Sequence, residues 1–182
     1  LFGYEKGAFT GAQQAQAGKF EQAQNGTLLL DEVTEMPLGL QAKLLRVLQE
    51  REVERVGGKK PVALDIRIIA TSNRDMADAV AKGVLREDVY YRLNVFPLLI
   101  PALRQRPEDI VSLARHFLAE HGGRSGRPGL QLSPAADAAL TGYAWPGNVR
   151  ELENVMQRAV IFAAGEVVEA DALHLPASVL AT

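Results

Sequence analysis

Along the first hundred positions, short apolar runs alternate with segments whose apolar residues are spaced as on one face of a helix. Residues 28–30 are all leucine, which predicts a strand buried on both faces inside a parallel sheet. Residues 64–70 and 95–100 are also largely apolar and predict two further buried strands. Residues 53–56 and the residues from Val62 onward lie on either side of the sequence Gly-Gly-Lys-Lys-Pro at 57–61, which predicts a hairpin with a flexible tip. Strands alternating with helices indicate an α/β fold with a parallel sheet.

Helical spacing appears between these strands. One helix is expected to begin at Pro37, and a second, short helix is expected over residues 76–82. Residues 1–26 are rich in Gly and Gln and are expected to form a loop. The predicted buried face of the first helix consists of Leu40, Leu44, Leu45 and Leu48.

The last eighty residues carry signals of helices only. We therefore predict two parts, an α/β part over residues 1–104 and an all-helical part over residues 105–182. The signals are Pro107 opening one helix, a loop over 122–130, Ser133 capping a second helix, Asn148 with Glu151 as a capping box on a third, and Gly165 ending it.

Composition narrows the class of protein. The chain has 182 residues, 47% of them hydrophobic, and a net charge of −2, which is typical of a soluble globular protein and untypical of a free-standing nucleic-acid binder. It has no cysteine and three scattered histidines, which argues against disulfides and structural zinc. No run could span a bilayer, so we expect a cytoplasmic protein without membrane contact. Because the chain opens with Leu-Phe-Gly instead of Met, we interpret it as a fragment of a longer parent protein.

Two acids follow the leucine strand. Asp31 and Glu32 lie where α/β sheets bind ligands, and a hard cation such as Mg²⁺ takes one carboxylate plus nucleotide phosphates. The second acid could polarise a water molecule for attack on a phosphate. The alternative is that Asp31 only caps the next helix. Asn73 ends the neighbouring strand and could orient water or phosphate, although Asn is also common wherever a strand turns.

Arg86 and Arg92 offer planar guanidinium groups suited to phosphate oxygens. The alternative is a pair of exposed ionic contacts with Glu87 or Asp88, which spacing alone favours.

Arg150 lies in the first turn of the third predicted helix. A cation opposes the positive end of the helix dipole there, which suggests a bound anion. Pairing with Glu151 or Glu153 is an equally good explanation.

The segment Gly7-Ala8-Phe9-Thr10-Gly11-Ala12 places one aromatic residue between two glycines. It could be a mobile loop that presents Phe9 and Thr10 to a partner, or Phe9 could fold back into the core. A phosphate loop of the form G-x-x-x-x-G-K-[ST] is absent from the sequence, since the Gly-Lys pairs at 18–19 and 58–59 are followed by Phe20 and Lys60.

Together these segments resemble the central AAA+ ATPase domain of bacterial sigma-54-dependent transcription activators, the NtrC-like enhancer-binding proteins. The resemblance runs from Leu1 to about Pro176. It rests on the GAFTGA signature at 7–12, a Walker B strand over 26–32, a first sensor over 70–75, arginine fingers at Arg86 and Arg92, and a second sensor over 145–152.

The resemblance implies a partial AAA+ parallel sheet followed by a helical lid subdomain. It implies that Asp31 holds Mg²⁺, Glu32 activates the attacking water and Asn73 senses the γ-phosphate of ATP. It implies that Arg86 and Arg92 reach the nucleotide of the adjacent subunit. The remaining implied site residues are Arg150, contacting the nucleotide from the lid, and Phe9 and Thr10, contacting the sigma-54 factor of RNA polymerase.

Members of this family work as rings, which implies a hexamer or heptamer of the parent protein. A regulatory domain, as in two-component systems, and a DNA-binding helix-turn-helix are further family expectations outside these 182 residues. Because no Walker A loop is present, we predict that this chain alone neither binds ATP tightly nor hydrolyses it.

Three other functions compete with this hypothesis. Residues 133–164, with Arg150 and Arg158, could form a helix-turn-helix DNA-binding module, although Leu152 and Val155 are predicted to be buried. Asp31 and Glu32 could serve a carboxylate hydrolase, although adjacent strand residues point to opposite faces. A scaffold that assembles without using nucleotide is the third.

Overall fold

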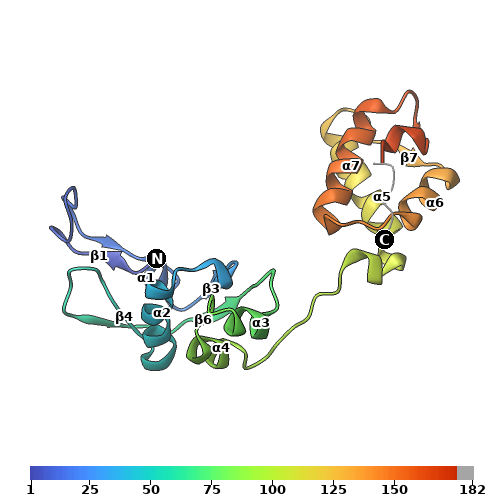
Figure 1. Ribbon diagram of the computed structural model, residues 1–182. Coiled ribbons are helices and arrows are strands. Elements are labelled where there is room, and N and C mark those ends of the chain that lie inside the picture. Colours follow the sequence, from blue (N-terminus) through green and yellow to red (C-terminus); the bar gives the residue numbers. More distant parts are fainter. Residues whose placement is uncertain (176–182) are drawn as a thin grey trace. The chain divides into compact units, whose positions relative to one another are not determined.

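The computed structural model describes residues 1–175, and the chain divides into two compact units between Leu98 and Leu99 (Figure 1). The sequence predicts the change of character slightly later, between residues 104 and 105. The last seven residues of the predicted helical part, including Pro176, lie outside the described residues.

The first unit contains the predicted parallel pair of strands. Strand β3 (Thr27–Leu30) pairs with β6 (Arg67–Ala70), with Leu28 opposite Ile68. Only one face of this pair packs on the core; Leu29 and Ile69, on the other face, are 57% and 44% exposed. The prediction of burial on both faces is therefore wrong, because the described residues cover a single face of β3 and β6.

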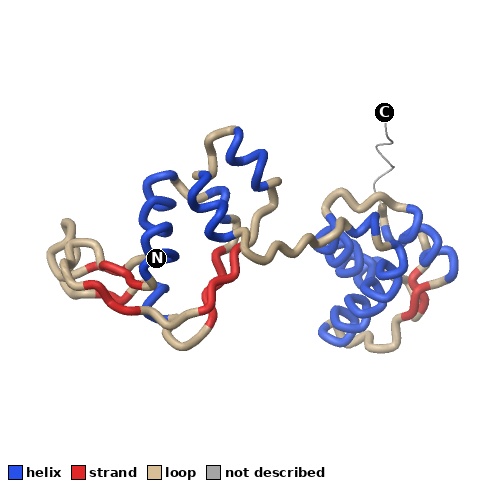
Figure 2. The backbone as a smooth tube through the Cα atoms, turned by 90° about the horizontal axis from the view of Figure 1, so that it is seen from below, coloured by secondary structure: helices blue, strands red, loops and turns tan. Residues whose placement is uncertain are grey.

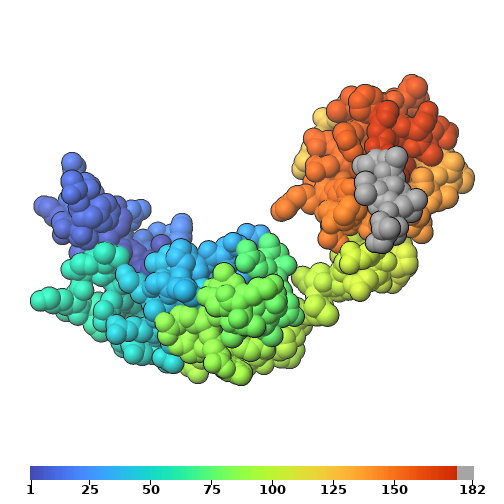
Figure 3. Space-filling model, viewed as in Figure 1, coloured from blue at the N-terminus to red at the C-terminus, as the bar shows by residue number. Residues whose placement is uncertain are grey.

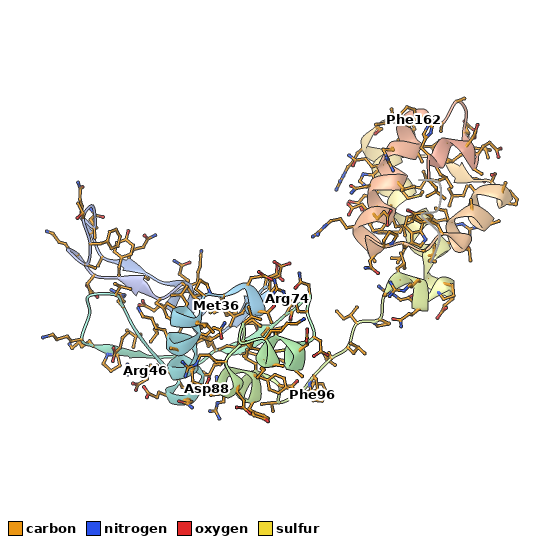
Figure 4. The ribbon with its side chains drawn as sticks, viewed as in Figure 1. Met36, Arg46, Arg74, Asp88, Phe96 and Phe162 are labelled. Atoms are coloured by element: carbon orange, nitrogen blue, oxygen red, sulfur yellow. The ribbon has the colours of Figure 1, made fainter. Side chains whose placement is uncertain are left out.

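The predicted strand over residues 95–100 does not form. Phe96, labelled in Figure 4, and Leu99 are 80% and 95% exposed, and the segment has no regular secondary structure. An apolar run becomes a strand only where a sheet edge accepts its backbone hydrogen bonds. Within residues 1–175 this run pairs with no strand.

Helix α2 (Leu38–Glu50) begins where Pro37 predicts it. Its buried residues are Gln41, Leu44, Val47 and Leu48, whereas the expected core residue Leu40 is 39% exposed. The buried face of α2 is therefore rotated relative to the predicted one, and the polar residue Gln41 occupies a fully buried position on it. The other helical segments of this unit are α1 (Lys19–Gln22), the 3₁₀ helix η1 (Val33–Glu35), α3 (Met76–Ala81) and α4 (Glu87–Leu93).

Two antiparallel hairpins complete the first unit (Figure 2). The predicted one consists of β4 (Glu52–Glu54) and β5 (Pro61–Ala63). The other, β1 (Gly3–Tyr4) with β2 (Gln16–Ala17), lies in the segment predicted to be loop. Directly after β2 the chain passes so close to β1 that a Cβ on Gly18 would collide with the backbone of Gly3.

The second unit is built around helices. Its elements are the 3₁₀ helix η2 (Leu103–Gln105), α5 (Pro107–Arg124), β7 (Gln131–Leu132), α6 (Pro134–Gly142), α7 (Asn148–Phe162), β8 (Val167–Val168) and η3 (Asp171–Leu173). Trp145 is fully buried in its core, and its indole N–H donates to the carbonyl of Leu140 at 2.9 Å. Among residues 1–175, every helix is too short or too polar to span a bilayer.

Helix ends in this unit match the sequence in part. Ser133 caps α6 as predicted, accepting the Ala136 N–H at 3.1 Å. Helix α5 runs to Arg124, so the predicted loop over 122–130 starts too early.

The capping box predicted at Asn148 is wrong. Glu151 accepts the N–H of Gly147 at 2.8 Å, one residue earlier, because the Asn148 side chain accepts the Leu103 N–H at 2.9 Å and so holds η2 instead. Helix α7 ends at Phe162, before Gly165.

Candidate functional site

Backbone hydrogen bonds continue past the ends of β3 and β6. Thr71 N–H donates to the carbonyl of Leu30 at 2.9 Å, and its carbonyl accepts the Val33 N–H at 2.9 Å. Glu32, between them, has a left-handed backbone with φ of 50°. This conformation is rare for a non-glycine residue and ends the strand alternation, so Asp31 and Glu32 both face the end of β6.

Side chains then join the two strand ends. The Thr71 hydroxyl donates to Asp31 Oδ1 at 2.6 Å, and its oxygen accepts the Glu32 N–H at 3.0 Å. Asn73 Nδ2 donates to Glu32 Oε1 at 3.4 Å. Asp31, Glu32, Thr71 and Asn73, here called the sheet-end cluster, thus bring together the three residues expected at this edge. Thr71 was not predicted; the only available signal was a hydroxyl beside Asn73 at a strand end.

The alternative that Asp31 caps the following helix is not observed. The residue before η1 is Glu32, and no side chain caps that helix. Asp31 and Glu32 are exposed, so their carboxylates are accessible to a ligand. Nearby, Arg74, labelled in Figure 4, pairs with Glu35 at 2.6 Å and leaves both carboxylates of the acids free of that ion pair.

Arg86 precedes α4 and pairs with Asp88 on the same chain. Its Nε and Nη2 lie 3.0 and 2.7 Å from the two Asp88 carboxylate oxygens. The hydrogen bonds from the Arg86 guanidinium lower the pKa of the Asp88 carboxyl. The contact anticipated as the alternative is therefore formed, and a phosphate would compete with Asp88 for the Arg86 guanidinium.

Arg92, at the other end of α4, makes a different contact. Its Nε and Nη2 both donate to the carbonyl of Leu48, at 3.1 Å each, in the last turn of α2. A cation is favourable at this negative end of a helix. The expected pairs with Glu87 or Asp88 are not formed by Arg92.

Arg150 is exposed in the first turn of α7. The predicted partner Glu151 instead accepts hydrogen bonds from Gly147 and Tyr143, and Glu153 Oε1 lies 3.8 Å from His121 Nε2. Within residues 1–175, Arg150 makes no hydrogen bond or ion pair, so its guanidinium is available to an external anion.

The loop over residues 7–12, here called the contact loop, projects from the first unit (Figure 3). Gly7 and Gly11 have φ of 81° and 103°, and the Gly7 N–H donates to the carbonyl of Ala12 at 2.8 Å. Phe9 remains 53% exposed and packs edge-to-face on Tyr4, with ring centroids 4.9 Å apart. The alternative of a core Phe9 is therefore wrong, and Thr10 is exposed beside it.

An ionic contact holds the base of this loop. Arg55 on the β4–β5 hairpin pairs with Glu21 at 2.6 Å and with Glu5 at 3.1 Å. The hydrogen bonds from Arg55 lower the pKa of the Glu21 carboxyl. Sequence reasoning missed this group because its members lie far apart in the chain.

Comparison with known proteins gives two family matches. Residues 1–99 match the family model described as "Sigma-54 interaction domain", and residues 104–181 match the one described as "AAA+ ATPase lid domain". The second match favours a lid over a helix-turn-helix for the helical residues.

Individual relatives agree. The chain is 58% identical over 179 residues to the response regulator protein FleR of Pseudomonas aeruginosa, covering 98% of this chain and 38% of FleR. It is similar to crystal structures of NtrX from Brucella abortus, in complex with ADP (TM-score 0.84, 40% identity, 97% of this chain and 39% of that one) and in complex with ATP (TM-score 0.81, 41% identity, 90% and 39%). The chain thus spans well under half the length of these relatives.

Proposed function

Because the chain belongs to the sigma-54 interaction family of AAA+ ATPases, we propose that it is the ATP-hydrolysing, sigma-54-contacting module of a longer transcription activator. The module uses ATP hydrolysis to remodel sigma-54 RNA polymerase. Support comes from the family matches over residues 1–99 and 104–181 and from NtrX structures in complex with ATP and ADP.

In this proposal the sheet-end cluster acts on the phosphates of ATP. Asp31 holds Mg²⁺, since its carboxylate is exposed and, among the residues that the structure describes, its one side-chain contact is the hydrogen bond from the Thr71 hydroxyl to Oδ1. Bound Mg²⁺ would neutralise charge on the phosphate oxygens. Glu32 accepts a proton from the attacking water, and Asn73, hydrogen-bonded to Glu32, detects whether the γ-phosphate is present.

Arg86 and Arg92 act on the nucleotide of the adjacent subunit in a hexameric or heptameric ring. A guanidinium supplied to the transferring phosphoryl group raises the rate of related enzymes ~10³–10⁵-fold. Supplying it from a neighbour makes hydrolysis depend on assembly. Arg86 is exposed, and within residues 1–175 Asp88 is the one partner of its guanidinium, so exchange of that carboxylate for a phosphate is chemically simple.

Arg150 contacts the nucleotide from the lid, and Phe9 and Thr10 contact sigma-54. Loss of the γ-phosphate removes charge-assisted contacts and so changes which arrangement of the module is favoured. The contact loop suits a moving element because, beyond the ionic contact at its base, residues 7–12 are held mainly by backbone hydrogen bonds and the Phe9–Tyr4 aromatic contact.

The observation that carries the proposal is the sheet-end cluster itself. At the carboxyl ends of parallel strands, where α/β sheets bind their ligands, Thr71 hydrogen-bonds with both acids and Asn73 donates to Glu32. A carboxylate hydrolase would leave the conjunction of this cluster with the contact loop unexplained.

We further propose that the 182-residue chain alone does not turn over ATP, because it contains no phosphate-binding G-x-x-x-x-G-K-[ST] segment. Mg²⁺-dependent turnover by this chain above that of its Glu32→Ala variant would contradict this statement.

The test of the proposed function compares Glu32→Ala with Glu35→Ala in the parent protein. Glu32→Ala should keep ATP binding and lose turnover by about 10²–10⁴-fold, as expected for removal of a general base. Glu35→Ala, which removes an acid three positions away that pairs with Arg74, should keep most turnover. Normal turnover by Glu32→Ala would refute the assignment.

A further inference from the structure

Helix α2 carries one polar side chain on its buried face. Gln41 is fully buried, although its neighbours on that face, Leu44, Val47 and Leu48, are apolar. A buried amide is costly unless its hydrogen-bonding groups are satisfied. Gln41 satisfies both ends of its amide with backbone groups from two separate segments.

Three hydrogen bonds define these contacts. Gln41 Nε2 donates to the carbonyl of Met36 at 2.7 Å and to the carbonyl of Val84 at 2.8 Å. Gln41 Oε1 accepts the backbone N–H of Arg86 at 2.8 Å. We call this arrangement the Gln41 clamp.

The two segments joined by the clamp are those that matter for the proposed reaction. Met36 directly follows η1, the short helix that begins after Glu32. Val84 and Arg86 precede α4, whose first turn carries Asp88. One side chain therefore connects the segment after the acids with the backbone from which Arg86 projects.

We infer that Gln41 is a positioning residue that fixes Arg86 for action on the nucleotide of the neighbouring subunit. The inference rests on the proposed function, in which Arg86 acts across the subunit boundary. Gln41 itself touches no nucleotide. It acts by holding the Arg86 N–H and the Val84 carbonyl, which sets the direction in which the Arg86 side chain projects from the backbone.

Only glutamine meets these requirements at this place. The clamp needs one acceptor and two donors at the end of a side chain of this length. Glutamate would keep the acceptor and lose both donors, and methionine would keep the approximate volume and lose all three bonds. Gln41→Met therefore removes the clamp with the smallest change in packing.

Mixed rings of the parent protein test this inference. Glu32→Ala subunits have a defective acid and intact arginines, so they can complete the site of a neighbour whose own Arg86 is lost or misplaced. Gln41→Met alone should lose about 10–100-fold in ATP turnover, as for misplaced catalytic groups. Mixed with Glu32→Ala subunits, it should recover turnover to an extent similar to that of Arg86→Ala in the same mixture.

A core variant separates positioning from general destabilisation. Leu44→Ala alters the same buried face of α2 but touches no group of the clamp. Its turnover per assembled ring should fall less than that of Gln41→Met and should not increase when it is mixed with Glu32→Ala subunits.

The outcomes are distinguishable. If Arg86→Ala recovers in the mixture and Gln41→Met does not, or if Gln41→Met alone keeps full turnover, the inference about Gln41 is wrong and the proposed function stands. If Arg86→Ala also fails to recover, the cross-subunit role of Arg86 is wrong, and the inference falls with it.

Amide hydrogen exchange on the unmodified chain gives a test that needs no variant to assemble. The Arg86 N–H should exchange at least about tenfold more slowly than the Glu87 N–H, which has no acceptor within residues 1–175. Equal exchange rates would show that the clamp does not hold Arg86 and would overturn the inference.

Discussion

The sheet-end cluster and the contact loop are held in place by different means. In the cluster, side chains from two strands bond to one another, and Thr71 contacts both acids. In the contact loop, Gly7 and Gly11 supply left-handed turns, and backbone hydrogen bonds with one exposed aromatic pair do the rest. The part assigned to chemistry is thus fixed by side-chain hydrogen bonds, whereas the part assigned to partner contact is held mainly by its backbone conformation.

The largest effect on ATP turnover is expected from removing Arg86, the group that the sheet-end cluster is proposed to receive from the adjacent subunit. Arg86→Ala should lower turnover by the parent protein ~10³–10⁵-fold, the rate factor that a guanidinium supplied to the transferring phosphoryl group contributes in related enzymes. Steady-state ATP turnover measures this, with Arg104→Ala, an exposed arginine in η2, as the matched control. A loss of turnover below tenfold would contradict the proposed role of Arg86 at the nucleotide.

Thr71→Val tests whether side-chain bonds fix the cluster. It keeps the shape of the residue but removes the hydroxyl that bonds to Asp31 and Glu32. Turnover should fall about 10–100-fold with little change in stability, since a small misplacement of catalytic groups is costly. Thr27→Val, on the exposed side of β3, is the control. Equal turnover in both variants would mean that Asp31 and Glu32 hold their positions without Thr71.

Gly11→Ala tests the glycine dependence of the contact loop. A side chain at φ of 103° is strained by about 1–2 kcal/mol, although open space surrounds the position. The Gly7 and Ala12 amides should therefore exchange hydrogen roughly tenfold faster, and turnover should change little. Gly39→Ala, in α2 with nothing near its Cβ, should stabilise the chain by about 0.5–1 kcal/mol. Unchanged exchange in Gly11→Ala would show that the loop does not need this backbone.

Thr10→Ala should have the smallest effect on turnover, within about twofold, because Thr10 is exposed and lies outside the cluster. Binding to sigma-54 and open-complex formation should nevertheless be lost, while Gln13→Ala keeps both. A loss of turnover equal to that of Thr71→Val would erase the distinction between the two regions.

How far the sequence could predict this arrangement depended on whether a general rule of chain geometry links the residues concerned. Asp31, Glu32 and Asn73 could be placed together because parallel strands share an edge for their carboxyl ends. Thr71 could not be assigned, since a hydroxyl at a strand end has many uses. Gln41 was missed because a polar residue in a helix is expected to be exposed, and because no strand pairing links it to its partner Arg86.

The fold shows the same limit. Helix α2 and the β4–β5 hairpin follow from local spacing and turn residues, and both form. Residues 95–100 and the outer face of β3 and β6 were predicted from apolarity alone, and both predictions failed. Apolarity shows that a segment can be buried, but the pairing edge and the covering layer must come from elsewhere.

The most direct test of the central claim is a structure of the assembled parent protein with Mg²⁺ and a transition-state analogue of ATP hydrolysis. We predict that Asp31 binds Mg²⁺, either directly, with a carboxylate oxygen about 2.1 Å from the ion, or by accepting a hydrogen bond from one of the ion's water ligands, and that Glu32 lies beside the attacking water. We also predict Arg86 of the adjacent subunit on the transferred phosphoryl group, released from Asp88. Acids turned away from the nucleotide, or Arg86 still paired with Asp88, would contradict the central claim.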